Sequence, residues 1–510
     1  MGNDYIEAAR VFHEITKHSY TSVRSSPHLL DWDIKPIPYK IYPGAASVAL
    51  PRDLNLSSTP TLSALSSYVP ADFSASIETA ALTRILFCAA GLTRRKRVGA
   101  DDYHFRAAAS AGALYPIEIY VAAGAVAGLE TGLYHFSPAD LRMAGLRRGD
   151  WRRYIADAAA KRLSILRARA VIALSAIYWR SEWKYRARAY RYCYWDAGTL
   201  LANLLAAAAA DEISAEVITA FEDPALEALL GIDGEREGMI ALVALGRSDE
   251  PAAPSPEIEP LALESIPLSS KEVAYADRAE MHRESRLVTA EEVAKVSAAK
   301  LDPAPRSSSA SNLRFETAAA EDSAGLGETI LRRGSSRAFA QDAITAEELA
   351  TIMAASSEHP QADFPALTDS YLIVNAVQGL APGAYYYDRQ ARAFELLKAG
   401  NFRGEAGYLC LEQPLGMDCS ALVVHMADLE RALRALGNRG YGDAHLEAGI
   451  LGGRAYLAAY SLGRGATGLT FYDDDTTKFF EPHAAGKSAL LMVALGIPRS
   501  RMSLQKPEES

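Results

Sequence analysis

Four segments from the first half of the sequence recur, in the same order, in its second half. The paired segments are 12–19 and 281–285, 128–136 and 379–387, 188–198 and 439–449, and 240–246 and 490–496. Strings such as Ala-Leu-Gly arise by chance, but a shared order of four does not. We therefore interpret the chain as a tandem duplication, so that any fold must be built twice.

The length of 510 residues also exceeds what one hydrophobic core supports. Residues 247–270 are rich in Pro, Glu, Ala and Ser and lack a long apolar period, which is typical of a linker. Repeated prolines before residue 52 indicate an extended arm that wraps over a neighbour. The predicted division is an N-terminal arm (1–60), a first domain (61–247), a linker and second arm (248–325) and a second domain (326–502).

Composition limits the function classes. A net charge of −10 leaves no basic excess for phosphates, so we expect no nucleic-acid partner. The four cysteines show no zinc-type spacing, and we expect no metal site. No signal peptide is visible, and the longest apolar stretch, 197–210, is too short to span a bilayer. We expect a cytoplasmic protein without a membrane partner.

Hydrophobic periodicity predicts a mixture of helices and strands. Helices are expected over 8–17, 76–92, 151–161, 197–210 and 345–352, and strands over 117–123, 132–136, 170–177, 239–246 and 490–496. Thr345 and Glu348 form a capping-box pattern at the start of their helix. The basic run 94–97 is interpreted as the solvated C-terminal end of the helix before it.

One loop has the character of a ligand site. It runs from Arg106 through Ala107, Ala108, Ala109, Ser110, Ala111 and Gly112 to Tyr115 and Pro116, just before a buried strand. Small residues allow close approach to a ligand, and glycine permits a tight turn. An ordinary small-residue turn is an equal alternative on these residues alone.

This small-residue loop (residues 106–116) resembles the flavin-binding loop of the nitroreductase superfamily, although Ala109 replaces the usual proline. In the second half, residues 331–339 contain clustered arginines and serines ahead of a helix, which suits a phosphate. This arginine segment resembles the superfamily's phosphate-binding motif. The resemblance implies FMN, with its phosphate held by Arg332, Arg333, Ser335, Arg337, Arg499 and Arg501. It also implies that Arg106, Ser110, Ala111, Gly112 and Gly468 approach the flavin.

The two halves have lost complementary pieces. Residues 57–80 of the first half contain no paired arginines, and residues 363–370 of the second half replace the small-residue loop. In nitroreductases the flavin lies at a dimer interface, between a loop of one subunit and arginines of the other. The resemblance thus implies an α+β fold of two tandem nitroreductase-like domains, each an antiparallel-rich sheet flanked by helices. Together they would form an intrachain pseudo-dimer with one complete FMN site.

The segment 180–192 carries aromatic and cationic residues into the apolar helix, and from composition alone it suits a charged, solvated helix. It resembles the Lys-Tyr stretch of the SagB/ThcOx branch, whose enzymes oxidise thiazolines and oxazolines in peptides to azoles with FMN. The resemblance makes Lys184 and Tyr185 catalytic candidates for proton removal. Residues 195–199 depart from the branch, which has a Gly-His pair there.

Three functions stay open at this point. The first is an azoline dehydrogenase acting on a modified peptide or small molecule. The second is an NAD(P)H-dependent reductase of nitro or quinone compounds; the sequence has no dinucleotide fingerprint, so NAD(P)H would bind only transiently. The third is a flavin-free scaffold or peptide-binding protein. Association beyond the pseudo-dimer is also open.

Overall fold

The computed structural model describes residues 2–66, 68–98, 101–301 and 312–499. Within these residues, each half of the chain forms a seven-stranded sheet whose neighbouring strands are all antiparallel. The first sheet has the order β1 (Ala46–Ala49), β8 (Arg142–Arg148), β7 (Gly132–Ser137), β5 (Ile117–Ala123), β9 (Ala170–Ile177), β11 (Glu237–Leu245), β10 (Ala215–Ile218). The second has the order β12 (Asn312–Leu313), β17 (Ala393–Ala399), β16 (Gly383–Asp388), β14 (Thr368–Val374), β18 (Ala421–Ala427), β20 (Ser488–Gly496), β19 (Gly465–Leu469).

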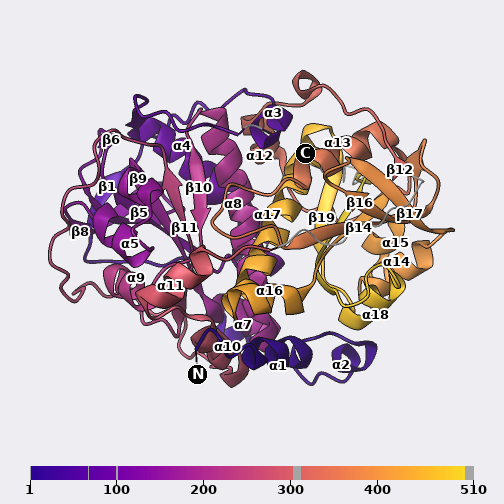
Figure 1. The fold of residues 1–510 in the computed structure, drawn as a ribbon, viewed down its shortest axis with the longest axis horizontal. Coiled ribbons are helices and arrows are strands. Elements are labelled where there is room, and N and C mark those ends of the chain that lie inside the picture. Colours follow the sequence, from indigo (N-terminus) through magenta and orange to yellow (C-terminus); the bar gives the residue numbers. More distant parts are fainter. Residues whose placement is uncertain (1, 67, 99–100, 302–311, 500–510) are drawn as a thin grey trace, which may run out of the picture.

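The two sheets have the same topology, strand for strand. This repetition confirms the tandem α+β fold predicted from the sequence. The halves lie side by side, the first in violet and the second in orange and yellow (Figure 1).

The central strands are buried on both faces. In β5, the predicted strand 117–123 is confirmed with its exact bounds. Side chains of a strand alternate between the two faces of its sheet. Ile119 and Val121 accordingly enter the large core that spans both halves, while Tyr120 and Ala122 enter a separate core of the first half.

Helices cover both sheets and fill the space between them (Figure 1). Those of the first half and linker are α1 (Glu7–Ile15), α2 (Tyr20–Arg24), α3 (Thr61–Ser66), α4 (Thr79–Ala90), α5 (Arg152–Ala158), α6 (Leu163–Leu166), α7 (Tyr178–Tyr185), α8 (Ala189–Ala210), α9 (Asp223–Leu230), α10 (Ala276–Ser285) and α11 (Ala290–Ser297). Those of the second half are α12 (Leu326–Arg332), α13 (Ala346–Ser356), α14 (Arg403–Leu409), α15 (Pro414–Asp418), α16 (Leu429–Leu436), α17 (Arg439–Ser461) and α18 (Asp473–Phe479). The capping box at Thr345 is confirmed, since its hydroxyl accepts from Glu348 N.

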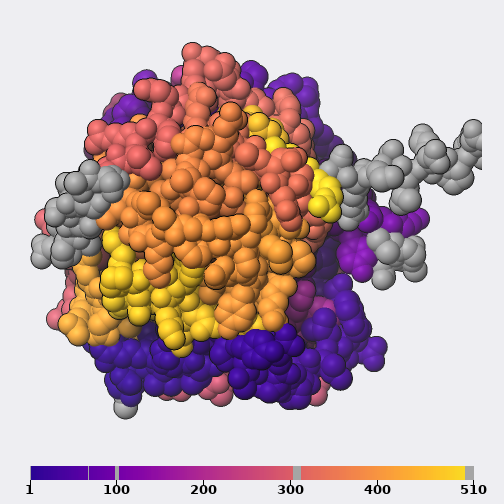
Figure 2. All heavy atoms as spheres, turned by 90° about the vertical axis from the view of Figure 1, so that its right-hand side faces the viewer, coloured from indigo at the N-terminus to yellow at the C-terminus, as the bar shows by residue number. Residues whose placement is uncertain are grey.

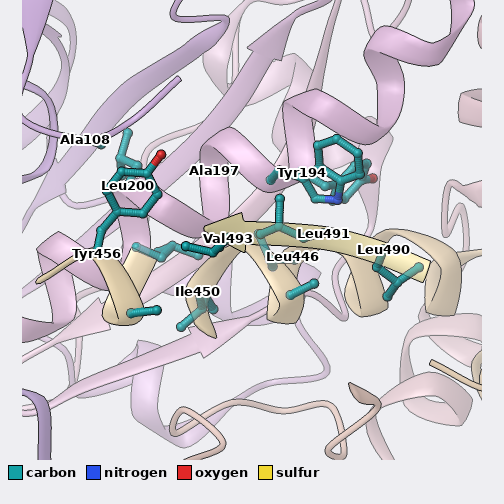
Figure 3. Close-up of a cluster of buried hydrophobic side chains, with 14 of the residues drawn as sticks. Ala108, Tyr194, Ala197, Leu200, Leu446, Ile450, Tyr456, Leu490, Leu491 and Val493 are labelled. Carbon is teal, nitrogen blue, oxygen red and sulfur yellow. The ribbon is translucent and has the colours of Figure 1, made fainter. Parts of the chain in front are cut away.

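The long helices α8 and α17 cross at the centre of the molecule. At the crossing, a Cβ on Gly198 would lie 2.6 Å from the Cα of Gly449, so only glycines allow the two backbones this close. Around this contact, Ala197 and Leu200 of α8 belong to one buried cluster with Leu446 and Ile450 of α17 and with residues of β20 (Figure 3). The crossing joins both halves into one continuous core.

Reciprocal ion pairs follow the same pseudo-twofold symmetry. Arg188, just before α8, reaches Asp473 of the second half, with 3.0 Å between nitrogen and oxygen. The corresponding residue of the second half, Arg439 at the start of α17, reaches Asp223 of the first half. Such self-complementary contacts are the pattern of a twofold dimer interface. The pseudo-dimer is therefore present within one chain.

The N-terminal segment wraps the second half before its β1 joins the first sheet. Arg10 of α1 donates to Glu430, with 2.9 Å between Nε and Oε2, and Ala9 N donates to Asn438. Figure 2 shows this segment, in indigo, along the base of the second half. The expected arm over a neighbour thus lies across the partner domain of the same chain.

One element differs from its prediction. The basic run forms β3 (Leu92–Val98), which pairs with β4 (Asp101–Arg106) in a separate hairpin, whereas a helix end was expected. The helix α4 ends at Ala90 because Gly91 takes an extended conformation. Two smaller ladders, β2 (Ile77–Glu78) with β6 (Val126–Ala127) and β13 (Ile344–Thr345) with β15 (Val377–Gln378), are parallel. No helix in the described part of the chain is long and apolar enough to cross a bilayer.

Candidate functional site

The small-residue loop of the first half and the arginine segment of the second half lie against each other. Arg333 follows α12 and is buried; its Nε donates to the carbonyl of Ala107 over 2.7 Å and its Nη2 to that of Arg106 over 2.8 Å. Segments more than 220 residues apart are thereby joined through main-chain oxygens. The predicted meeting of the two pieces is present in the structure.

The loop itself is held from beneath by α8. Asp196 accepts hydrogen bonds from Ser110 Oγ and from Ala111 N, the latter over 2.9 Å. Thr199 Oγ1 donates to the carbonyl of Ala109 over 2.6 Å. Tyr115 N donates to Ser110 Oγ, which tightens the turn. These polar residues inside an otherwise apolar helix fix the path of the loop.

Gly112 occupies the tightest point of the loop. Its φ of +64° lies in the left-handed region that favours glycine. A Cβ there would lie 2.7 Å from the hydroxyl oxygen of Tyr185 and 3.3 Å from Nζ of Lys184. The loop backbone therefore lies directly against the predicted catalytic pair.

Lys184 and Tyr185 end α7, half-buried at the junction of the halves. Burial, and secondly the charge of Arg337 from the other half, lower the pKa of Lys184. Burial raises the pKa of Tyr185, and its ring meets that of Tyr192 edge-on at 4.5 Å between centroids. No carboxylate of the described chain forms a salt bridge with Lys184. The lowered pKa favours a neutral amine that can accept a proton.

On the second-half side, the candidate site is bordered by β19 and α17. Gly468 N donates to the hydroxyl of Tyr456, which also lies 3.3 Å from Ser335 Oγ. Tyr456 and Ala108 of the loop belong to the same buried cluster (Figure 3). The hydroxyl of Tyr192 lies 3.3 Å from Thr470 Oγ1, just after β19. Residues of both halves thus contribute to one surface.

Other predicted residues have partners within the protein. The guanidinium of Arg106 is buried between the rings of Tyr39 and Tyr115 and donates to the carbonyl of Pro38. Arg332 pairs with Glu328 over 3.1 Å. Arg499 is exposed, its N–H bonded to Ala338 O, and Arg501 lies outside the described residues. Flavin contact by these four stays a prediction.

The residues present fit a flavin phosphate and ring. Ser336 Oγ is buried without a hydrogen-bond partner in the described structure, and Arg337 is exposed beside Lys184. Hydroxyl and guanidinium donors suit a phosphate, and the cramped glycine at 112 suits close approach of a flat ring. No group of three or more His, Cys, Asp and Glu side chains in the described residues has metal-site geometry.

Sequence reasoning missed Asp196, which stood in the sequence only as a departure from the branch pattern. The interpretation of 180–192 as a solvated helix is wrong, since Arg180, Arg188 and Arg191 are buried and hydrogen-bonded. A carboxylate within an apolar helix was the available signal for Asp196, because such a group needs specific donors when buried.

Asp196 predicts a distinct pH dependence. Burial raises its pKa to about 7, against the hydrogen bonds from Ser110 and Ala111, which lower it. A carboxyl whose folded pKa exceeds its unfolded value loses stability as pH rises between the two. From pH 4 to 8 we expect wild type to lose on the order of 4 kcal/mol relative to Asp196→Asn. Chemical unfolding of both proteins across this range measures the difference; a pH-independent difference would contradict the assignment.

The pseudo-twofold counterpart of this site is filled by the chain itself. Asp363 accepts from the N–H groups of Thr219 and Ala220, over 2.8 and 3.1 Å, just after β10. Residues 361–363 pair with Val217 of that strand through two main-chain hydrogen bonds. Because β10 corresponds to β19, this segment covers the strand that is equivalent to β19 of the candidate site. The complementary loss seen in the sequence therefore has a structural basis.

The chain is similar in sequence and structure to several known proteins. The sequence profile of the nitroreductase family matches residues 73–247 and 330–501. A putative nitroreductase, MJ1384 of Methanocaldococcus jannaschii, is 31% identical over 169 residues, which cover 33% of this chain and 80% of the relative. The crystal structure of a putative nitroreductase from Anabaena variabilis is similar with a TM-score of 0.76 and 27% identity, covering 96% of this chain and 99% of the other. The Escherichia coli microcin synthetase McbBCD complex with truncated pro-MccB17 also matches, at a TM-score of 0.32 and 15% identity over 48% of this chain and 93% of that one.

Proposed function

The chain belongs to the nitroreductase family, and from this premise we propose that it is an FMN-dependent oxidoreductase with one active site per chain. The observation that carries the proposal is the contact of Arg333 with the carbonyls of Arg106 and Ala107. It joins the two parts of the proposed flavin site: the small-residue loop of the first half and the arginine segment of the second half. The filled counterpart at Asp363 supports a single site.

Bound FMN would supply the redox chemistry by accepting a hydride through N5. Arg337 and Ser335 would hold its phosphate, and Gly112 and Gly468 would let backbone approach the ring. Lys184, half-buried with its pKa lowered, would take the proton that the substrate releases. Tyr185, whose pKa is raised, would stay neutral and donate a hydrogen bond.

We propose an azoline ring, on a peptide or small molecule, as the substrate. Oxidation of an azoline to an azole removes one hydride and one proton, which matches a hydride acceptor beside a base. The Lys-Tyr pair lies at the loop on the first-half side only, since the helix before α17 ends at Leu436 without either residue. A single reactive centre follows.

A second candidate is an NAD(P)H-dependent reductase of nitro or quinone compounds. The hairpin of β3 and β4 favours it, because Arg94 and its basic neighbours are exposed beside the arginine segment. A Cβ on Gly334 would lie 3.4 Å from Nη2 of Arg94. Exposed cations at the mouth of the site would attract the phosphates of a transient dinucleotide.

Flavin content tests the proposal first. Absorbance before and after denaturation should give one FMN per chain, and Arg337→Ala should weaken FMN binding about tenfold or more, since it removes a charged phosphate donor. Lys184→Ala is the matched variant: it should keep its flavin and lose turnover. Two FMN per chain would contradict the single site, and none after adding FMN would favour a scaffold.

Substrate assays separate the two enzymes. Oxygen-dependent azole formation supports the dehydrogenase, whereas NADPH turnover with a quinone supports the reductase. The reductase should also lose rate when Arg94 is replaced by glutamine, because its reductant would lose an attracting charge. The dehydrogenase with an uncharged azoline should be unaffected by that change.

A further inference from the structure

A small cavity of about 120 Å³ lies at the pseudo-twofold counterpart of the phosphate end of the proposed flavin site. Its walls come from α3 and the residues after it, the end of α8, the start of β10 and the segment 358–361. Counting from the crossing glycines, Leu205 and Ala209 of this cavity correspond to Tyr456 and Tyr460. The element α3 likewise corresponds to α12, which leads into the arginine segment.

The cavity lacks counterparts of the arginines in the arginine segment, and Arg454 supplies a positive charge instead. Tyr68 and Val69 line the cavity after α3, where the second half has arginines. Instead Arg454 of α17 lines the cavity with 9% of its surface exposed. Its Nη1 donates to the carbonyl of Glu358 over 2.6 Å, and within the described residues no carboxylate lies within ion-pair distance. Most donors of a buried guanidinium are therefore unused.

The neighbouring charges do not neutralise Arg454. His359, also in the wall, points Nδ1 at Glu447 over 2.7 Å and Nε2 at the carbonyl of Phe364 over 2.9 Å. Glu447 also accepts from the N–H groups of Leu367 and Thr368, over 2.7 and 2.8 Å, so its carboxylate is engaged away from Arg454. The carboxylate of Glu358 pairs with the exposed Arg392 over 2.9 Å. One buried positive charge is left facing the cavity.

We propose that this cavity binds a small oxyanion of the phosphate class, held by the guanidinium fork of Arg454. Guanidinium matches phosphate with two parallel hydrogen bonds and strengthens them in a water-poor site. The volume is below the roughly 300–1,000 Å³ of pockets for larger organic ligands, so a flavin is excluded. The pseudo-twofold counterpart of the proposed flavin site thus keeps a position for an anion, although it has lost the position for a flavin ring.

The test uses the FMN-loaded protein, so that the phosphate position of the first site is already filled. Thermal unfolding is followed while inorganic phosphate is titrated at constant ionic strength against chloride, with glycerol phosphate in parallel. We expect saturable stabilisation of wild type, and binding about tenfold weaker or lost in Arg454→Gln. Tighter binding of glycerol phosphate would identify a phosphomonoester as the ligand, and equal or weaker binding would identify the free oxyanion.

Two further variants keep the result decisive. Ala209→Leu fills the cavity from α8 without touching Arg454, and it should also abolish the shift. Arg434→Gln removes an exposed helical arginine paired with Glu430 and should leave the shift unchanged. A wild-type protein without saturable stabilisation, or equal affinity in wild type, Arg454→Gln and Ala209→Leu, would overturn the proposal. Flavin content is unaffected by either outcome, so the proposed function is tested separately.

Discussion

The Gly112→Val variant is expected to lose turnover by about 100-fold or more, because a shift near 1 Å in a reacting group costs this much. A side chain at this position would meet the hydroxyl of Tyr185 and Nζ of Lys184 at 2.7 and 3.3 Å. Relief of the clash must move either the loop or the proposed catalytic pair, Lys184 and Tyr185. Either movement separates the groups that the structure brings together.

Gly463→Val is the matched control. Its φ of +74° imposes the same backbone strain, about 1–2 kcal/mol, but nothing lies within 4 Å of its Cβ position. Both variants should lose stability in chemical unfolding through this strain, and only Gly112→Val should lose turnover and retained flavin. Equal turnover in the two variants would show that the close approach at Gly112 has no role in activity.

The Asp473→Asn variant is expected to lose about 3–5 kcal/mol of unfolding free energy. Asp473 is buried and pairs with Arg188 and Arg191, with nitrogen–oxygen distances of 3.0 and 2.7 Å. Removal of the carboxylate leaves two buried guanidinium groups without an anion. The same carboxylate also accepts from His18 N of the N-terminal segment, so three segments share it.

Asp474→Asn is the control for this effect, since its exposed carboxylate pairs with Lys17 only at the surface. Exposed pairs contribute about 0–1 kcal/mol. Denaturant midpoints of wild type, Asp473→Asn and Asp474→Asn measure the difference.

Burial raises the pKa of Asp473, but the charges of Arg188 and Arg191 have the larger effect, and the pKa is lowered. Its contribution should therefore be present at neutral pH and disappear as pH falls through the lowered pKa, whereas the variant lacks this dependence. Similar midpoints for both variants would contradict the interface role.

Much of the fold could be predicted from sequence because its signals are local or repeated. Strand 117–123 is apolar except for Glu118 and follows a proline, and the order of four repeats indicated two copies of one topology. The prediction of a helix end at the basic run 94–97 was wrong, because this run becomes a strand only by pairing with β4. Its helical interpretation used charge alone, and charge does not distinguish a hairpin from a helix end.

The pairing of the small-residue loop with the arginine segment was predicted only through resemblance, since no periodicity links residues 106 and 333. Asp196 and the filled counterpart at Asp363 escaped prediction for the same physical reason. Their roles are set by partners far along the chain, as in the hydrogen bonds that the N–H groups of Thr219 and Ala220 donate to Asp363.

The sequence by itself determined the duplication, the order of the elements and which half kept which flavin-like motif. The first two follow from repeated strings and from periodicity within short windows, and the third follows from the resemblance of two short motifs to the nitroreductase superfamily. The tertiary structure alone decided that α8 and α17 cross at two glycines and that Arg333 meets the carbonyls of Arg106 and Ala107. Such contacts depend on burial and geometry between distant segments. Their free energy therefore cannot be inferred from any local sequence pattern.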